Sequence, residues 1–378
     1  MFALNEEQLM TKKMVHDFVE EEVIPEAMNI DKTSEFPLKL IHKMGELGLM
    51  GIPIPEKYGG AGTDFMSYVL AIEEIARGSA TAAIILEVHT SVGSFPILYF
   101  GTEEQKQKYL PKLARGEMIG AFALTESNAG SDSSSIITTA ERKGDHYVIN
   151  GAKRFITNAG YAGVYTVFAT TDRSKGSHGV TAFLLDANTS GLKIGKPEEK
   201  MGLHGSATCE LTLEDVLIPV ENRLGDDGQG FKIAMSLLDG GRVGVAAQAL
   251  GIGQAAFEAA LAYSQERVQF KQAIIDFQGI QFMLADMATE LEAARLLVYQ
   301  AAALRTSGLP YSKEASMAKL FASDVAMKVA TDAVQILGVY GYTREYKVER
   351  YLRDAKITQI YEGTNQIQRI LIARHLRK

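Results

Sequence analysis

The chain has 378 residues, enough for two or three domains, and its 46% apolar and 22% charged residues are ordinary for a globular protein. A net charge of −7 argues against a nucleic-acid-binding surface. Cys209 is the only cysteine, so the chain can form neither an internal disulfide nor a metal site built from several thiolates.

Residues 1–118 have the pattern of helices separated by prolines and glycines. Apolar residues recur near helical spacing over 6–22, and apolar helices are predicted over 65–76 and 82–99. Thr102 is a good N-cap for a further helix that ends near residue 113. We therefore predict that residues 1–118 form an N-terminal all-helical domain.

The first residues carry Glu6 and Glu7 and lack the basic and then apolar pattern of a signal peptide. No segment is expected to reach the roughly 18 apolar residues that a membrane span needs. We expect no membrane insertion and a cytoplasmic protein, or a mitochondrial-matrix protein if a transit peptide has been removed.

From residue 119 to residue 228 the apolar period changes toward two. Cys209, Leu211 and Leu213 alternate with polar residues, and turn signals such as Asn150-Gly151 separate other strand-like runs. This pattern predicts a compact, mostly antiparallel β domain over 119–228.

Helical spacing returns over residues 229–378. Ile280, Leu284, Met287 and Leu291 step by four and three residues, which is typical of a long helix in a bundle. The order is therefore helices, a β domain and a helical bundle. A doubly wound α/β enzyme is disfavoured, because it would alternate strand and helix throughout.

Two segments of the β region have the composition of a cofactor site. The run 122–132 (FALTESNAGSD) offers hydroxyls and backbone N–H groups that suit a phosphate or a polar heterocycle, although a strand with a Gly-Ser turn also explains it. Phe155 and Thr157 are two residues apart and share a strand face, so one can stack on a flat ring while the other hydrogen-bonds its edge. A core phenylalanine and a solvated threonine are the simpler interpretation of that pair by itself.

Several familiar motifs are absent or misplaced. The run 251–256 (GIGQAA) matches a dinucleotide-binding pattern but lies inside a helical run, so we interpret its glycines as close helix contacts. The seven histidines lack metal-ligand spacing, and no metal site is predicted. Arg242 follows Asp239 and two glycines, where it could receive a phosphate or polar chain or could be a solvated helix residue.

Glu362 is the only charged side chain between Lys356 and Arg369. Tyr361 can exclude water from it, and Gly363 lets another molecule approach the backbone. An acid in such a setting tends to have a raised pKa and to transfer protons. On the local run alone, an acid that complements the dipole of a helix capped by Thr364 or Asn365 is an equally physical explanation.

Taken together, in order and spacing, four segments resemble the acyl-CoA dehydrogenase family, and the resemblance covers nearly the whole chain. They are 123–132 (ALTESNAGSD), 155–158 (FITN), 335–338 (QILG) and 353–368 (RDAKITQIYEGTNQIQ). The similarity is greatest to bacterial short-chain, butyryl-CoA-type members. It implies an α+β multidomain fold, with an N-terminal helical domain (1–118), a middle antiparallel β-barrel domain (119–228) and a C-terminal four-helix bundle domain (229–378), assembled as a homotetramer.

The resemblance also implies FAD and a set of site residues, with Glu362 as the catalytic base. Positions that match flavin contacts are Phe122, Leu124, Thr125, Gly130, Ser131, Phe155, Ile156, Thr157, Thr364 and Gln366. Positions that match contacts to the FAD of a neighbouring subunit are Arg267, Phe270, Gln278, Gln335 and Gly338. Positions that match contacts to the CoA thioester are Ser131, Asp239, Arg242, Gly363 and Arg374.

The activity implied is oxidation of a saturated acyl-CoA to the trans-2-enoyl-CoA, with electrons passed to an electron-transfer flavoprotein. Some relatives place the base just before the arginine that matches Arg242, but here that position is Gly241. Helix 81–99 contains no Lys or Arg, so we expect a short or medium monocarboxylic acyl chain. An oxidase-like relative that uses O2 and a non-catalytic binding or scaffold relative remain the alternatives.

Two departures from the family pattern concern FAD. Ser127-Asn128 replaces a common Pro-Gly in the flavin segment, which leaves the rigidity of that loop open. Val339 stands where a second glycine is usual after Gly338, which leaves the detail of the intersubunit contact open.

Overall fold

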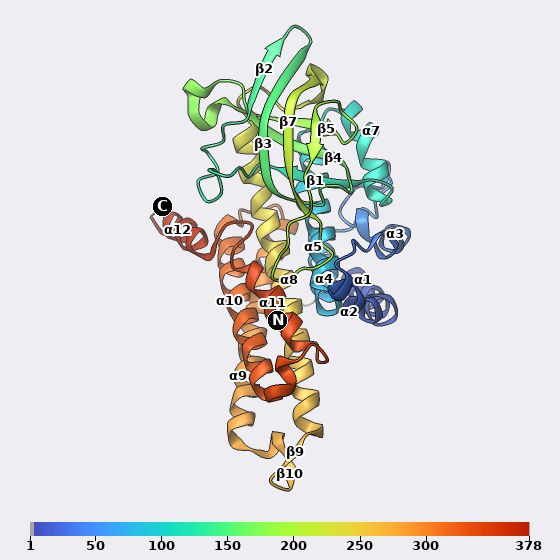
Figure 1. Ribbon diagram of the computed structural model, residues 1–378, viewed down its shortest axis with the longest axis vertical. Coiled ribbons are helices and arrows are strands. Elements are labelled where there is room, and N and C mark those ends of the chain that lie inside the picture. The colour runs from blue at the N-terminus through green and yellow to red at the C-terminus, as the bar shows by residue number, and fades with distance from the viewer. Residues whose placement is uncertain (1–3, 378) are drawn as a thin grey trace.

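The computed structural model describes residues 4–377, and its N-terminal part is helical (Figure 1). The helices are α1 (Glu6–Phe18), α2 (Ile24–Thr33), α3 (Leu38–Glu46), α4 (Phe65–Gly78), α5 (Ala80–Val88), α6 (Phe95–Phe100) and α7 (Glu103–Ala114). The predicted cap at Thr102 is confirmed, because its hydroxyl accepts the N–H of Gln105, whose side chain accepts the N–H of Thr102. The predicted helices 6–22 and 82–99 are each interrupted by a wider π-helical turn, at Val19–Val23 and His89–Ser94.

The middle region is one sheet with short edge strands. Its strands are β1 (Ile119–Ala123), β2 (Thr139–Lys143), β3 (His146–Thr157), β4 (Ala162–Thr170), β5 (Val180–Asp186), β6 (Leu192–Ile194), β7 (Thr208–Pro219) and β8 (Arg223–Leu224). They lie in the order β6-β7-β3-β2-β4-β5-β8, and β1 pairs with β4. The alternation in β7 is confirmed, since Cys209, Leu211 and Leu213 are buried in the core of the sheet.

The expected antiparallel barrel is wrong in two respects. The sheet is mixed, because β4 pairs in parallel with both β1 and β2. It is also open, since its described strands form a path that ends at β6 and β8 without pairing the two. Alternation along a strand reports which face is buried, but closure depends on whether the two edges meet, and no local pattern encodes that.

The C-terminal part is again helical. Its elements are α8 (Gly230–Glu266), the hairpin β9 (Val268–Gln269) and β10 (Gln272–Ala273), α9 (Gln278–Thr306), α10 (Ser312–Leu337), α11 (Val348–Thr358) and α12 (Asn365–Leu376). Helix α8 runs from beneath the sheet to the hairpin at the far end of the molecule, with α9, α10 and α11 packed around it (Figure 1). The predicted stripe on α9 is confirmed, because Leu284, Met287 and Leu291 are buried.

Close packing of α8 against α4 explains a glycine in the middle of α8. A Cβ atom at Gly251 would lie 2.2 Å from the carbonyl oxygen of Glu73 on α4, so the glycine of the rejected dinucleotide pattern is a helix-contact residue.

The expectation that no segment has the apolar length of a membrane span was wrong. Two described stretches, Ala80–Phe100 and Gly230–Glu266, meet that criterion, but their apolar windows are 83% and 67% buried inside the molecule.

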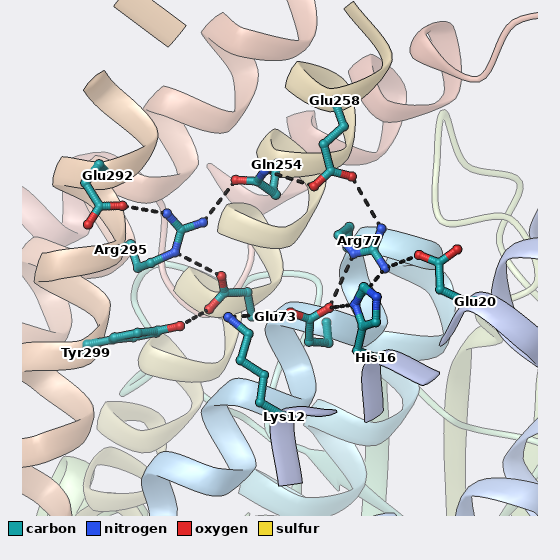
Figure 2. Close-up of polar contacts among 11 residues, drawn as sticks. Lys12, His16, Glu20, Glu73, Arg77, Gln254, Glu258, Glu292, Arg295 and Tyr299 are labelled. Atoms are coloured by element: carbon teal, nitrogen blue, oxygen red, sulfur yellow. Dashed lines mark hydrogen bonds and ion pairs between the residues drawn. The ribbon is translucent and has the colours of Figure 1, made fainter. Parts of the chain in front are cut away.

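A network of charged groups joins the N-terminal helices to α8 and α9 (Figure 2). Arg77 on α4 contacts Glu20 and Glu258, and Arg295 on α9 contacts Glu73 of α4. We name this set the interdomain network; its members are Lys12, His16, Glu20, Glu73, Glu74, Arg77, Gln254, Glu258, Glu292, Arg295 and Tyr299. Its ion pairs and hydrogen bonds cross four helices, so it fixes how the two helical regions sit against each other.

Candidate active site

Glu362 lies in the turn between α11 and α12, in a strained backbone conformation. Its φ is 53° and that of Gly363 is 90°, and a left-handed conformation costs a residue other than glycine about 1–2 kcal/mol. Thr364 is the N-cap of α12 and accepts the N–H of Ile367. The carbonyl oxygens of Glu362 and Gly363 accept hydrogen bonds from Gln368, at 3.1 and 2.9 Å. The turn is therefore held from the helix that follows it.

Glu362 as a whole is half-buried, but the Oε2 atom of its carboxyl group is buried and unsatisfied. That atom has no hydrogen-bond partner among the described residues. Burial raises the pKa of Glu362 to about 7, and the nearby cations Arg242 and Lys319 oppose that rise. The group is therefore poised to exchange a proton near neutral pH.

Two glycines of α8 make room for this acid and for a second one. A Cβ atom at Gly241 would lie 2.9 Å from Oε2 of Glu362 and 3.5 Å from Oε1 of Glu87, and a Cβ at Gly244 would lie 2.8 Å from Glu87. Glu87, on α5, accepts a hydrogen bond from Ser91 at 2.7 Å. Burial, followed by the charge of Glu362, raises the pKa of Glu87 well above its usual value. Glu87 therefore faces the site as a neutral acid, which avoids placing two like charges side by side.

Tyr361 orients the same turn toward α5. Its hydroxyl donates a hydrogen bond to Oε1 of Gln248 on α8, and Nε2 of Gln248 donates to the carbonyl of Ala80 at 2.9 Å. Burial raises the pKa of Tyr361, so it stays a neutral donor. This chain of contacts fixes the position of the Glu362 turn relative to the helix that carries Glu87.

The sheet places the expected flavin residues of β1 and β3 beside one another. The N–H of Arg154 donates to the carbonyl of Thr125 at 2.8 Å, and the pairing of β3 with β7 shifts register between Lys153 and Ile156. At this bulge Phe155 has φ 56° and is 64% exposed, whereas Ile156 is buried. Thr157 follows on the partly exposed side of the strand. Phe122, Leu124 and Thr125 continue from the end of β1.

The loop that carries Gly130 and Ser131 is anchored by a buried ion pair. Lys153 donates to Glu126 at 2.7 Å, and Glu126 also accepts the N–H groups of Ile137 and Thr138. Both Gly130 and Ser131 are exposed, and nothing lies within 4 Å of a Cβ built on Gly130. The exposed ring of Phe155 and the hydroxyl of Thr157 suit a flat heterocycle. The open loop at Gly130 suits a phosphate group attached to it.

The remaining expected flavin positions lie elsewhere on the molecule. Arg267, Phe270 and Gln278 surround the β9–β10 hairpin, and Gln335 and Gly338 lie at the C-terminal end of α10. Phe270 is 91% exposed. The hairpin lies at the end of the molecule opposite the sheet (Figure 1). The structure therefore divides the expected flavin residues into two distant sets within one chain.

The expected substrate residues also form more than one group. Arg242 donates to Asp239, which also accepts a hydrogen bond from Ser312 at 3.0 Å. The Nε atom of Arg242 is buried without a partner among the described residues. Gly363 adjoins Glu362, whereas Ser131 lies on the β-domain loop and Arg374 is exposed on α12. A cavity of about 360 Å³ is lined in part by Thr364, Gln366 and Arg369.

Sequence reasoning missed Lys319, Glu87, Gln368 and the pair Glu126–Lys153. Each had a weak signal. Lys319 stands among small residues on the buried side of α10, and Glu87 is the only acid over residues 80–100. A charged residue on an apolar helix face suggests burial, but it does not say which distant residue it meets.

Family models match three consecutive parts of the chain. The acyl-CoA dehydrogenase N-terminal domain matches residues 5–117, the middle domain 121–216 and the C-terminal domain 228–377. The chain belongs to the acyl-CoA dehydrogenase family. The helical, middle and helical order expected from the sequence is thereby confirmed.

Individual family members are similar over their full length. An acyl-CoA dehydrogenase of Bacillus subtilis is 58% identical over 99% of this chain and 98% of its own. The solved butyryl-CoA dehydrogenase of Megasphaera elsdenii is 50% identical, with a TM-score of 0.98 and coverage of 100% of both chains. A chain from a structural study of the electron-transferring flavoprotein of Acidaminococcus fermentans is 56% identical, with a TM-score of 0.98, and the match covers 100% of this chain and 99% of that one.

Proposed function

We infer that this acyl-CoA dehydrogenase family member is an FAD-dependent enzyme that oxidises a saturated acyl-CoA to the trans-2-enoyl-CoA. The observation that carries the inference is Glu362, a buried acid with an unpartnered Oε2 and a pKa raised to about 7. Gly241 supports it, because its missing side chain leaves the space in front of that carboxyl group. The bound FAD would accept the hydride that leaves the β carbon of the acyl chain.

The chain's own residues account for the proton. Glu362, as carboxylate, removes the proton on the carbon next to the thioester carbonyl. That proton is weakly acidic, so the carbonyl oxygen needs a hydrogen-bond donor as negative charge develops on it. The backbone N–H of Glu362 donates to no group among residues 4–377 and is available for that purpose. Burial of Glu362 brings its basicity closer to what the step requires.

We propose that the residues that would hold the flavin are those of β3 and of the segment after β1, namely Phe155, Ile156, Thr157, Phe122, Leu124, Thr125, Gly130 and Ser131. We propose that Thr364 and Gln366, at the start of α12, also contact the flavin. Arg267, Phe270 and Gln278 lie around the β9–β10 hairpin, at the end of the molecule opposite the sheet (Figure 1). The guanidinium group of Arg267 lies over the ring of Tyr340, which follows Gln335 and Gly338 closely in the chain. We propose that Arg267, Phe270, Gln278, Gln335 and Gly338 contact the FAD of a neighbouring subunit in a homotetramer.

For the substrate, we propose a short monocarboxylic acyl-CoA, held by Asp239, Arg242, Gly363, Ser131 and Arg374. The similarity to a butyryl-CoA dehydrogenase supports a short chain. His89, the one basic residue of helix 81–99 in the sequence, accepts the N–H of Gly120 through Nδ1 and therefore donates from Nε2 to Met50. Burial lowers its pKa to about 4, so it is neutral and cannot pair with a second carboxylate.

One cation approaches α6 from another helix. Arg305 of α9 lies over the ring of Phe95, with 4.7 Å between its guanidinium carbon and the ring centre, and over Phe65 at 3.8 Å. Aromatic rings rather than a carboxylate hold it. Turnover of glutaryl-CoA comparable with that of butyryl-CoA would overturn the monocarboxylic assignment.

The remaining assignments concern partners and organisation. We propose that an electron-transfer flavoprotein reoxidises the flavin, as the similarity to the Acidaminococcus chain supports. We also propose a cytoplasmic location and the domain limits 1–118, 119–228 and 229–378.

Anaerobic mixing with butyryl-CoA tests the function directly. Butyryl-CoA should bleach the absorbance of the FAD-loaded protein, and crotonyl-CoA should appear in equal amount. Acyl chains of increasing length then define the preference. An unbleached flavin with every acyl-CoA would leave a binding or scaffold role, and rapid peroxide formation in air would identify an oxidase.

A further inference from the structure

Lys319 is buried beneath the turn that carries Glu362. It lies on α10 and is fully buried, beside small residues such as Ala315 and Ala322. Its Nζ donates to the carbonyl oxygen of Gly363 and to Oδ1 of Asn365, both at 2.9 Å. Both acceptors are neutral. Burial of an ammonium group with neutral acceptors is unfavourable, so packing alone does not explain a lysine at this position.

The contacts of Lys319 lie at the C-terminal side of the strained part of the turn. Gly363 follows Glu362 directly, and both have a positive φ. Asn365 begins α12 and donates through Nδ2 to Ser323 and Asp324 of α10, at 2.9 and 2.7 Å. Lys319 therefore ties Gly363 and Asn365 to α10, while Gln368 of α12 donates to the carbonyl oxygens of Glu362 and Gly363.

We propose that Lys319 is a positioning residue for proton abstraction: it fixes the backbone that carries Glu362 and supplies a positive charge that favours the carboxylate form of this base. The proposal rests on the proposed function. It assigns to α10 a direct influence on the reaction, although no residue of α10 is expected to touch the reacting carbon.

The ionisable groups around the base come from several elements. Arg242 faces it from α8, Lys319 from α10 and Glu87 from α5, while Asp324 faces Lys319. Burial lowers the pKa of Lys319 to about 7, and the charges of Glu362 and Asp324 oppose that fall. Removing the positive charge of Lys319 leaves Arg242 as the remaining cation that lowers the pKa of Glu362. That pKa should therefore rise further.

The test compares Lys319→Met, Lys319→Gln and Lys319→Arg in the FAD-loaded protein, with Lys328→Met as a control on the exposed face of the same helix. Flavin reduction by butyryl-CoA is measured as a function of pH. In Lys319→Met and Lys319→Gln the midpoint of the pH–rate profile should shift to a pH about one unit higher. Below that pKa the rate should therefore fall about tenfold, and it should recover at high pH. Lys319→Arg and Lys328→Met should follow the wild-type profile.

Lys319→Gln keeps a donor for the carbonyl of Gly363 and removes only the charge, so it decides the question if Lys319→Met does not fold. An independent readout is the infrared band of the protonated Glu362 carboxyl, identified by its loss in Glu362→Gln. This band should persist to higher pH in the two neutral variants, whether or not any acyl-CoA is turned over. An unshifted band overturns the proposal, and so does a rate loss that is equal at every pH. An unreduced wild-type flavin would instead overturn the proposed function.

Discussion

Two buried acids lie beside different parts of helix α8, and they differ in what surrounds their oxygens. Glu73 lies near Gly251 and is fully satisfied, because Arg295 donates to one oxygen at 3.2 Å and Tyr299 to the other at 2.8 Å. Glu362 lies near Gly241 with a buried oxygen that has no partner among the described residues. Burial of the carboxyl oxygens is common to both acids, so the unpartnered Oε2, which the neighbouring Glu87 also has, separates Glu362 from the structural acid Glu73.

The same contrast extends to the surroundings. Glu73 belongs to the interdomain network, in which hydrogen bonds and ion pairs join side chains on α1, α4, α8 and α9 (Figure 2). Of the two cations near Glu362, in contrast, Lys319 contacts only neutral backbone and amide oxygens, whereas Arg242 pairs with Asp239. Loss of one partner from a network of matched charges leaves a buried charge uncompensated and destabilises the fold. A buried acid without a matched partner has a perturbed pKa, which is typical of a functional site.

The strongest test of this comparison exchanges each acid for its amide. Glu362→Gln should retain FAD and bind acyl-CoA but reduce its flavin with butyryl-CoA at least ~10²-fold more slowly, because the general base is lost. Glu73→Gln is the matched control and should reduce its flavin at close to the wild-type rate. Stopped-flow absorbance measures both. A near-normal rate in Glu362→Gln, or an equal loss in both variants, would reject the assignment of the base.

The reverse test removes a partner from the satisfied acid. Arg295→Met leaves Glu73 buried with only Tyr299, which should cost about 3 kcal/mol of stability. The melting temperature should fall by several degrees while the pH profile of flavin reduction stays unchanged. Lys193→Met breaks an exposed ion pair with Glu214 and should cost less than about 0.5 kcal/mol. If Arg295→Met were as stable as Lys193→Met, the interdomain network would not be what holds the helices together.

The smallest expected effect concerns the wild-type protein alone. Since the carboxylate form of Glu362 is the active base and its pKa is about 7, kcat/KM for butyryl-CoA should rise with pH up to this value and then level off. One pH unit below the pKa only about a tenth of Glu362 is ionised, so the rate constant should be about tenfold lower there. A profile that is flat across this range would mean that Glu362 has an ordinary acid pKa.

The sequence by itself determined the features that depend on neighbours along the chain. Helical and strand periods, the caps at Thr102 and Thr364 and the lone charge at Glu362 could all be recognised within a few residues. These features also carry the family resemblance, and with it the order of the three regions. Periodicity and capping depend on residues within one or two turns of each other, so these elements and caps could be predicted from the local sequence.

Only the tertiary structure decided which distant groups meet. The sheet, which was expected to be a closed barrel, is open in the structure. The structure also places Phe270 on the β9–β10 hairpin, at the end of the molecule opposite the sheet to which Phe155 belongs. It brought Glu87 and Lys319 to the Glu362 turn, although Lys319 and Gly363 are 44 residues apart in sequence. The physical reason is that burial and charge pairing depend on which surfaces pack together, and a residue's own neighbours in the chain do not specify them.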